Sequence, residues 1–282
     1  MEKVYLQLYS LGHELNDFPK ALEKVAAIGY AGVEFADNYG GLTGAELKQK
    51  LAGYGLEGLS AHVGCDKLPE QVEMLAEAGV RYVVDPFGRF SNGEETLRMA
   101  EKLNKAGELC RQHGMVFGYH NHTQEFNPLS ESDPHADASC AYLLDLLIAH
   151  TDPALCMFQL DVGWAAAAGV DPVAYIQKHA GRIRLIHAKE AGKVLGVKPP
   201  VDFSKMTFDS EGRPIFTDEM KRAFKEVQET NVATGQGIVD WAAVKRAADA
   251  QGAEAYIVER EWDYLNDIYA CVQADYTYLK EI

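Results

Sequence analysis

Cysteine is scarce in this chain and never forms a recognisable metal or redox motif. The sequence has 5 cysteines and no C-x-x-C pair, and their spacing fits neither a zinc site nor a disulfide framework. No segment approaches the roughly 18 consecutive apolar residues of a membrane-spanning helix. The N-terminal segment MEKVYLQLYSLGHEL lacks the basic and apolar regions of a signal peptide. These absences predict a reduced, cytoplasmic protein with no membrane partner.

Basic residues are outnumbered by acidic ones. The chain has 27 Lys and Arg against 42 Asp and Glu, which gives a formal net charge of -15. Because such a charge repels phosphate backbones, we expect no nucleic-acid partner. Net charge does not describe a single basic pocket, so a small phosphorylated substrate stays open at this stage.

The chain does contain a regular alternation of short β-rich runs and amphipathic helical segments. The helical pattern from Phe18 to Ile28 is closed by Gly29, and T-G-A-E at 43–46 and S-N-G-E at 91–94 have the pattern of capping boxes. Eight strand–helix units follow one another, and connections too long for hairpins require parallel strands. The expected strands are 4–10, 32–36, 56–63, 81–87, 115–122, 155–163, 182–190 and 255–261.

A closed (β/α)8 TIM barrel is the simplest arrangement of eight such units. The competing open sheet needs a glycine-rich phosphate turn after an early strand, and YSLGHEL is a poor match. We therefore predict one α/β domain over residues 1–282. The stretch at about 191–231, with a short helix near 218–228, is expected to be an enlarged loop. It could cover the active face or pair with another subunit, which leaves a homo-oligomer open.

Polar residues gather at the C-terminal ends of the predicted strands, where TIM barrels build their sites. Alternate residues of a strand share a face, so this spacing tests whether side chains can converge. The pairs that share a face are His120 and His122, Gln159 and Asp161, His187 and Lys189, and Glu259 and Glu261. All of these pairs can point into the barrel mouth without breaking the alternation.

Two imidazoles and two carboxylates from four consecutive strands suit a divalent cation that keeps positions open for substrate oxygens. We predict one such ion, held by His120, Asp161, His187 and Glu259. Mixed nitrogen and oxygen donors favour Mn²⁺, Co²⁺, Fe²⁺ or Zn²⁺ over an all-oxygen site, with Mg²⁺ kept as an alternative.

Further residues near strand ends are expected to contact a bound substrate. Lys189 lies two positions past His187 on the same face, which suits it to stabilise developing oxyanion charge. The other expected contacts are Gln7, Glu34, His62, Trp164 and Glu261.

The segments GYAGVEF, YHNHTQEF, LDVGWAAAAGVDP, LIHAKE, GQGIVDW and YIVERE occur in this order along the chain. In order and spacing they resemble the xylose isomerase-like TIM-barrel superfamily, in its sugar phosphate isomerase/epimerase branch. The resemblance implies a divalent-metal enzyme that acts on a small sugar or sugar phosphate, with glutamate, aspartate, histidine and glutamate as ligands. Asp161, His187 and Glu259 match that set, whereas His120 stands at the position of the first glutamate.

The resemblance implies isomerisation or epimerisation through a metal-stabilised enediolate, with glutamates that also pass protons. Because position 120 is histidine, the base that complements Glu259 is expected among His122, Glu125 and His62. Inosose dehydratase relatives have a similar YHHHMGT type of segment, so a metal-dependent keto-sugar dehydratase or lyase is the alternative. A non-catalytic sugar-binding barrel and an abasic-site endonuclease are less expected, the second because the chain is acidic.

Overall fold

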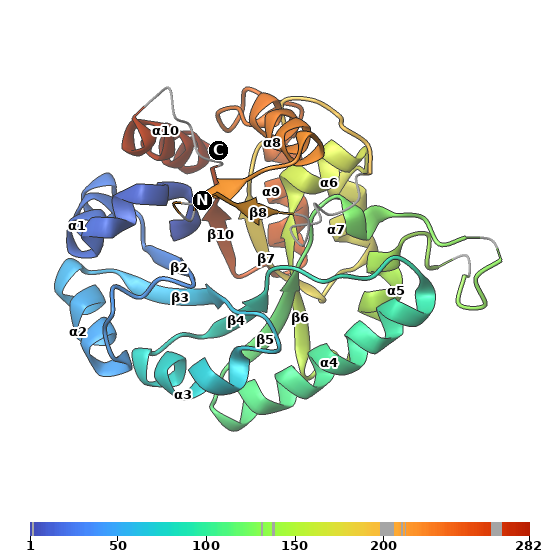
Figure 1. Cartoon of the computed structure of the whole chain (residues 1–282), viewed down its shortest axis with the longest axis horizontal. Helices are drawn as coiled ribbons and strands as arrows, with labels where there is room; N and C mark the ends of the chain where they lie inside the picture. Colours follow the sequence, from blue (N-terminus) through green and yellow to red (C-terminus); the bar gives the residue numbers. More distant parts are fainter. Residues whose placement is uncertain are drawn as a thin grey trace.

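The computed structural model describes residues 1, 3–130, 132–136, 139–197, 206–209, 211, 213–260 and 267–282. Parallel strands close into a barrel in the order β1-β10-β7-β6-β5-β4-β3-β2 (Figure 1). The predicted TIM barrel is therefore confirmed. Its strands are β1 (Val4–Gln7), β2 (Gly32–Ala36), β3 (Glu57–His62), β4 (Tyr82–Asp85), β5 (Val116–His120), β6 (Cys156–Asp161), β7 (Ile183–Ala188) and β10 (Ala255–Val258).

Helices surround the barrel, and their ends follow from local capping (Figure 1). Asp17 caps the first long helix, which Gly29 ends in a left-handed conformation, and both halves of the predicted box at Thr43 are present. The fourth helix is capped by Asn92 rather than by the predicted Ser91, because the Asn92 side chain accepts from the Glu95 amide. The helices are α1 (Phe18–Ile28), α2 (Gly44–Tyr54), α3 (Leu68–Ala78), α4 (Gly93–Gln112), α5 (Leu143–Ala149), α6 (Val162–Ala168), α7 (Pro172–Lys178), α8 (Asp218–Thr230), α9 (Trp241–Ala250) and α10 (Ile268–Glu281).

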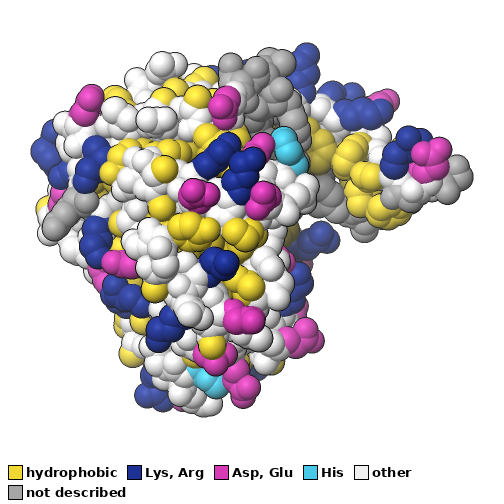
Figure 2. All heavy atoms as spheres, turned by 90° about the vertical axis from the view of Figure 1, so that its left-hand side faces the viewer, with side chains coloured by type: hydrophobic (Ala, Val, Ile, Leu, Met, Phe, Trp, Pro, Cys, Tyr) yellow, Lys and Arg dark blue, Asp and Glu magenta, His cyan; other side chains and the backbone are white. Residues whose placement is uncertain are grey.

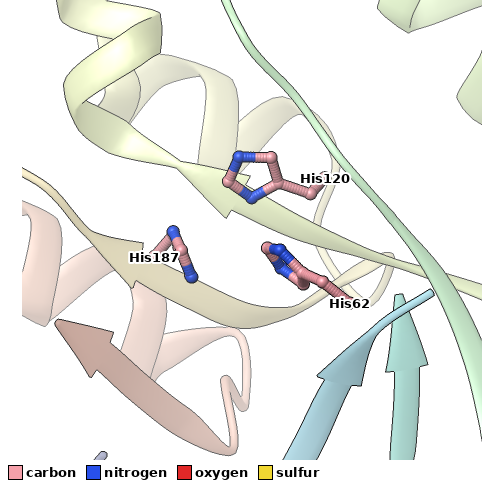
Figure 3. A group of neighbouring side chains, drawn as sticks. All are labelled: His62, His120 and His187. Atoms are coloured by element: carbon pink, nitrogen blue, oxygen red, sulfur yellow. The ribbon is translucent and has the colours of Figure 1, made fainter. Parts of the chain in front are cut away.

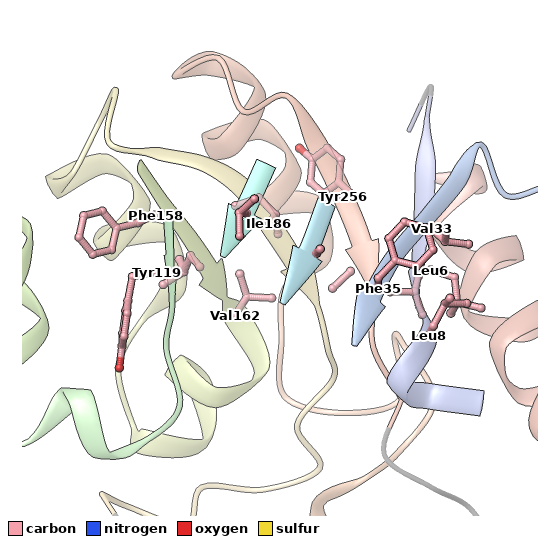
Figure 4. Close-up of a cluster of buried hydrophobic side chains, with 14 of the residues drawn as sticks. Leu6, Leu8, Val33, Phe35, Tyr119, Phe158, Val162, Ile186 and Tyr256 are labelled. Atoms are coloured by element: carbon pink, nitrogen blue, oxygen red, sulfur yellow. The ribbon is translucent and has the colours of Figure 1, made fainter. Parts of the chain in front are cut away.

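Two apolar layers hold the barrel together. The larger layer lies between the strands and the surrounding helices and includes Phe35, Phe158 and Ile186 (Figure 4). A smaller cluster fills the floor of the barrel and consists of Tyr5, Leu59, Tyr82, Val84, Met157, Leu185, Ala255 and Ile257. Each large side chain that is fully buried contributes about 1.5–3 kcal/mol, and the packed floor closes the barrel at its N-terminal end.

The segment between β7 and α9 is larger than the other connections. It contains a small antiparallel hairpin of β8 (Thr207–Phe208) and β9 (Pro214–Ile215), followed by α8. The predicted helix near 218–228 is thus present and slightly longer. Residues 198–205, 210 and 212 of this segment lie outside the described residues.

Two short 3-10 helices complete the described secondary structure that bears on the site. One, η1 (Leu8–Asp17), follows β1, and the other, η2 (Gln124–Phe126), follows β5. Sequence periodicity predicted neither. Both lie at the C-terminal end of the barrel and shape the entrance to its interior.

The surface carries charges of both signs. On the face drawn in Figure 2, acidic and basic side chains are interspersed with apolar ones. Within the described part of the chain, no helix has the length and apolar character needed to cross a membrane. The chain ends lie together, since the Met1 amino group donates to the Leu279 and Ile282 carbonyl oxygens at 3.0 and 3.2 Å.

Candidate active site

Glu34, on β2, is a fully buried carboxylate directly above the apolar floor. Gln7 Nε2 and Ser60 Oγ donate to its oxygens at 2.7 and 2.6 Å. His187 Nε2 and His62 Nε2 lie 2.8 and 3.0 Å from the same carboxylate. Burial opposes ionisation, but His62 and His187 outweigh it and hold the pKa of Glu34 well below its usual range. Glu34 is therefore an ionised group that orients imidazoles.

Gln159, on β6, connects this carboxylate to two histidines. Its Nε2 donates to Glu34 at 2.7 Å, and its Oε1 lies 2.9 Å from His62 Nε2 and 3.0 Å from His120 Nδ1. An amide oxygen only accepts hydrogen bonds, so both ring nitrogens must carry the hydrogen. Burial and the neighbouring imidazoles hold the pKa of His120 well below its usual range. A neutral His120 with a protonated Nδ1 presents an Nε2 lone pair to the site.

Three imidazoles converge at the C-terminal end of the barrel (Figure 3). The ring centroid of His120 lies 4.7 Å from that of His187 and 5.1 Å from that of His62. They come from β5, β7 and β3. One donor atom from each could bind a common ion, since these atoms lie within 4.8 Å of one another.

A second group of donors contains more negative charge and fits a cation better. One donor atom each from Asp161, His187 and Glu259 lie within 4.8 Å of one another. His187 Nδ1 is 3.5 Å from Asp161 Oδ2 and 3.4 Å from Glu259 Oε2, distances longer than usual hydrogen bonds. His120 Nε2 approaches the same Asp161 oxygen at 4.0 Å. The four residues predicted as metal ligands therefore gather at one place.

The buried atoms of this second group lack other partners. Among the described residues, Asp161 Oδ2 and His187 Nδ1 have no hydrogen-bond partner, although both are buried. Leaving such polar atoms unsatisfied costs about 1–3 kcal/mol each. In the histidine group, one nitrogen of each of two rings is instead bonded to Gln159, namely His62 Nε2 and His120 Nδ1. A divalent cation bound by carboxylate oxygens and neutral imidazoles would satisfy both orphaned atoms, so the residues present fit such an ion.

The local fold explains why one Asp161 oxygen is left over. Asp161 is both the last residue of β6 and the cap of α6, and its Oδ1 accepts from the Trp164 amide at 2.7 Å. Asn121 fixes the same strand end, because its side-chain oxygen accepts from the Asp161 amide at 3.0 Å. The helix cap therefore occupies Oδ1 with a hydrogen bond, and Oδ2 faces His187.

Glu259 follows β10 and is held on its other side by Lys189. Lys189 Nζ lies 2.9 Å from Glu259 Oε1 and 4.8 Å from the centre of the Trp164 ring. Burial raises the pKa of Glu259, but Lys189 and His187 outweigh it and lower that pKa to about 2. Lys189 is thus positioned by an ion pair and an aromatic face, and Trp164 packs beneath it.

His122 and Glu125 occupy different environments despite their closeness in sequence. The His122 ring lies 5.0 Å from His120 and 5.7 Å from Phe87, and burial lowers its pKa to about 4. Glu125 is fully buried, and its carboxylate accepts from the His122 amide at 2.8 Å and from Tyr119 Oη at 2.7 Å. The Glu125 carboxylate therefore supports the turn that carries His122.

A cavity of about 370 Å³ opens above these groups, within the range of roughly 300–1,000 Å³ typical of small-molecule sites. Its lining residues are Tyr9, Ala36, Asp37, His62, Pro86, Phe87, His120, His122 and Glu259.

Several residues expected to contact a substrate lie outside this lining. Gln7 and Glu34 are beneath it, in the hydrogen-bonded layer, and Trp164 and Lys189 lie behind Glu259. Glu261 lies outside the described residues.

Some residues that lie beneath the cavity or at its mouth were not predicted as site residues from the sequence. Strand alternation placed Gln159 on the face of Asp161, but the sequence assigned no role to it. Tyr9 in η1 and Asp37 and Phe87 in loops gave less signal, because the path of the chain beyond a strand end cannot be read from periodicity. Asp37 is half exposed and lies at the cavity mouth.

Comparison with known proteins agrees with the barrel fold. A family model described as a xylose isomerase-like TIM barrel matches residues 22–280. The chain belongs to this family. Membership in the xylose isomerase-like TIM-barrel family confirms the resemblance noted from the sequence motifs.

Individual relatives are distant. An inosose dehydratase of Geobacillus thermodenitrificans is 25% identical over 283 residues, which cover 90% of this chain and 85% of that protein. The crystal structure of a sugar phosphate isomerase/epimerase from Parabacteroides distasonis has a TM-score of 0.75 at 24% identity, covering 99% of this chain and 93% of that one. The structure of an L-ribulose 3-epimerase has a TM-score of 0.67 at 14% identity, covering 100% and 94%. These relatives are a dehydratase, an isomerase/epimerase and an epimerase, and the two solved structures share the fold of this chain.

Proposed function

We propose that the protein is a divalent-metal-dependent sugar isomerase or epimerase that works through an enediolate. One observation carries the proposal: the orphaned atoms Asp161 Oδ2 and His187 Nδ1 lie 3.5 Å apart, and His187 Nδ1 lies 3.4 Å from Glu259, which lines a cavity of about 370 Å³. The ligands would be Asp161, His187, Glu259 and His120. When bound, a divalent ion supplies Lewis acidity that polarises a sugar carbonyl and makes the adjacent C–H acidic.

The chain supplies the proton-handling groups around that carbonyl. Glu259 and His122 both line the cavity, and we assign them as the pair that removes and returns the proton. Lys189, paired with Glu259 at 2.9 Å, keeps that carboxylate ionised and adds positive charge near a developing oxyanion. Glu125 is assigned to hold the turn of His122, since its hydrogen bonds go to that turn.

A second candidate reaction is dehydration of a keto-sugar. It is favoured by the 25% identity to an inosose dehydratase over 90% of this chain. The same enediolate can expel a β-hydroxyl if an acid protonates the leaving oxygen, and His62 at the cavity wall is placed to serve as that acid. Proton exchange without loss of water separates the isomerase from the dehydratase.

Solvent-deuterium exchange tests the proposal. Metal-loaded protein is incubated in D₂O with neutral and phosphorylated keto-sugars, and deuterium at the carbon beside the carbonyl is measured by NMR. We expect Glu259→Gln to reduce exchange at least about 100-fold, the lower range for loss of a general acid–base group. We expect His187→Ala to abolish metal binding and exchange together.

Glu70→Gln, at an exposed carboxylate on α3, is the matched control and should keep full exchange. Retention of both metal and exchange in Glu259→Gln and His187→Ala would refute the mechanism. Appearance of a conjugated enone absorbance in the wild type, with water lost, would assign the protein to the dehydratases instead.

A further inference from the structure

The rim of the cavity differs in character from its base. The base is built from imidazoles and Glu259, whereas the rim consists of Asp37 after β2, Tyr9 after β1 and Phe87 after β4. None of these rim residues enters the proton chemistry proposed above. They are placed to touch the part of a ligand that points away from the reacting carbon.

We propose that the rim recognises the distal end of a neutral keto-sugar that carries a free hydroxyl instead of a phosphate, with Asp37 as the acceptor of that hydroxyl. This inference rests on the proposed function and names its substrate class. Three observations support it: the charge of the cavity lining, the backbone conformation of Asp37, and the aromatic side chains of Tyr9 and Phe87.

The charge around the cavity disfavours a phosphate group. Among the described residues, its lining contains the carboxylates of Asp37 and Glu259 and no Lys or Arg. The two lysines that approach it are each paired with one of these carboxylates: Lys67 Nζ lies 2.8 Å from Asp37, and Lys189 Nζ lies 2.9 Å from Glu259. A dianionic phosphate at the rim would face Asp37 with no cation in the lining to compensate it, whereas a hydroxyl could donate to that carboxylate.

The backbone at Asp37 is left-handed, which is uncommon for a residue that carries a side chain. Among the described residues, Asp37 is the only non-glycine residue with a positive φ, at 53°. This left-handed conformation costs an L-residue with a Cβ about 1 kcal/mol, and glycine would adopt it freely. Residues held in this way cluster at ligand sites. The carboxylate of Asp37 therefore remains at a position where its backbone would favour glycine.

The aromatic rim residues suit a sugar ring. Tyr9 and Phe87 are 41% and 37% exposed, although large apolar side chains are usually covered. The Phe87 ring also meets His122 edge-on at 5.7 Å, which fixes one wall of the cavity. An aromatic face packs against the C–H face of a sugar, while a carboxylate beside it accepts a hydroxyl.

Binding to matched sugar pairs tests the inference. The metal-loaded protein is titrated calorimetrically with ketohexoses and ketopentoses, each compared with its own terminal phosphate, for example D-fructose and D-fructose 6-phosphate. We expect at least one neutral sugar to bind at least about tenfold more tightly than its phosphate ester, equivalent to a difference of about 1.4 kcal/mol. Equal or tighter binding of the phosphate ester, or no binding of any neutral sugar, would overturn the inference.

Variants at the rim separate recognition from structure. Asp37→Gly removes the side chain and relaxes the backbone, and we expect it to raise KM or Kd for the neutral sugar about tenfold, with kcat little changed. Lys67→Met removes only the ion-pair partner and is the matched control, expected to stay within about threefold. If Asp37→Gly and Lys67→Met change KM or Kd for the neutral sugar by the same factor, Asp37 acts only as part of a surface ion pair and the assignment is wrong.

The outcomes also distinguish this inference from the proposed function. Binding of a neutral sugar without deuterium exchange would end the isomerase proposal and leave the rim assignment standing. Exchange that occurs only with a phosphorylated sugar would support the isomerase and refute the rim assignment.

Discussion

Gln159 sets the protonation pattern of the site at the scale of a single residue. One amide bonds simultaneously to Glu34, His62 and His120, at 2.7 to 3.0 Å. Because its oxygen can only accept, it fixes which nitrogen of each ring carries the hydrogen. Groups that orient metal-binding histidines in this way commonly change metal affinity 10- to 100-fold when removed, in rough terms.

Replacement of Gln159 by leucine should therefore weaken metal binding. We expect Gln159→Leu to raise the Kd for Mn²⁺ roughly 10- to 100-fold, because His120 loses the bond that orients it. Gln7→Leu is the control, since Gln7 also donates to Glu34 but contacts no predicted ligand. Both variants should lose stability, and only Gln159→Leu should lose affinity in a calorimetric titration. Equal Kd values for the two variants would contradict the assigned role of Gln159.

Glu125 should make stability depend on pH. Burial raises its pKa from 4.5 to about 7, although Tyr119 and the His122 amide donate to it. Between these two pH values the folded state holds a proton that the unfolded state has released, so this group's contribution to stability falls as pH rises from about 4.5 to about 7. Glu125→Gln cannot titrate. Urea unfolding should show wild-type stability falling relative to the variant over this interval, whereas parallel curves would contradict the prediction.

At the scale of elements, the junction of β6 and α6 decides where the Asp161 carboxylate points. The helix starts directly after the strand, with Asp161 as its cap, and Gly163 packs on the β7 end. A Cβ on Gly163 would lie 2.5 Å from the Lys189 carbonyl oxygen, which is backbone and cannot yield easily. The junction therefore requires a glycine two residues after the ligand.

Gly163→Ala tests this junction. We expect it to destabilise the fold by about 1–3 kcal/mol, as overpacking does, and to reduce metal affinity by displacing β7 from α6. Gly53→Ala is the control, because a Cβ there meets nothing within 4 Å and Gly53 is an exposed position of α2. The control should be neutral or more stable by up to about 1 kcal/mol. Thermal unfolding gives the change in stability of both variants. A Gly163→Ala variant as stable as the wild type would show that the junction can accommodate a Cβ beside the Lys189 carbonyl oxygen.

Elements with regular periodicity could be predicted from the sequence, and the loops that complete the site could not. Strand alternation placed Asp161, His187 and Glu259 on the inward face, and they do converge. The segment after β1 instead contains η1, in which Gly12 departs from helical angles, so it shows no simple period. The positive φ at Asp37 could not be predicted either, because glycine is the residue that usually marks such a position.

At the scale of the whole molecule, barrel closure brings residues from distant parts of the chain to one point. His62 and His187 lie 3.0 and 2.8 Å from the Glu34 carboxylate, although 153 residues separate Glu34 from His187 in the sequence. Such a site exists only in the folded chain, so a bound ion stabilises the fold by mass action. A bound ion would satisfy the buried atoms of Asp161 and His187 that have no hydrogen-bond partner among the described residues.

Metal removal should therefore lower the melting temperature. An ion at 100 times its Kd adds about 2.7 kcal/mol to the stability of the fold, and we expect chelation to reverse that gain. Mn²⁺ added back to the chelated protein should restore Tm in a concentration-dependent manner. His187→Ala should show no such response, and a wild-type Tm that is indifferent to chelation and to added metal would contradict the prediction.

The central claim is that Asp161, His187 and Glu259, joined by His120, bind one divalent ion below the sugar cavity. Anomalous diffraction from crystals soaked in Mn²⁺ tests it most directly, because the ion is located independently of activity. We predict one peak at about 2.0–2.3 Å from Asp161 Oδ2, His187 Nδ1, His120 Nε2 and a Glu259 oxygen. A peak between His62 and other residues instead, or none at this position with the ion in excess, would contradict the claim.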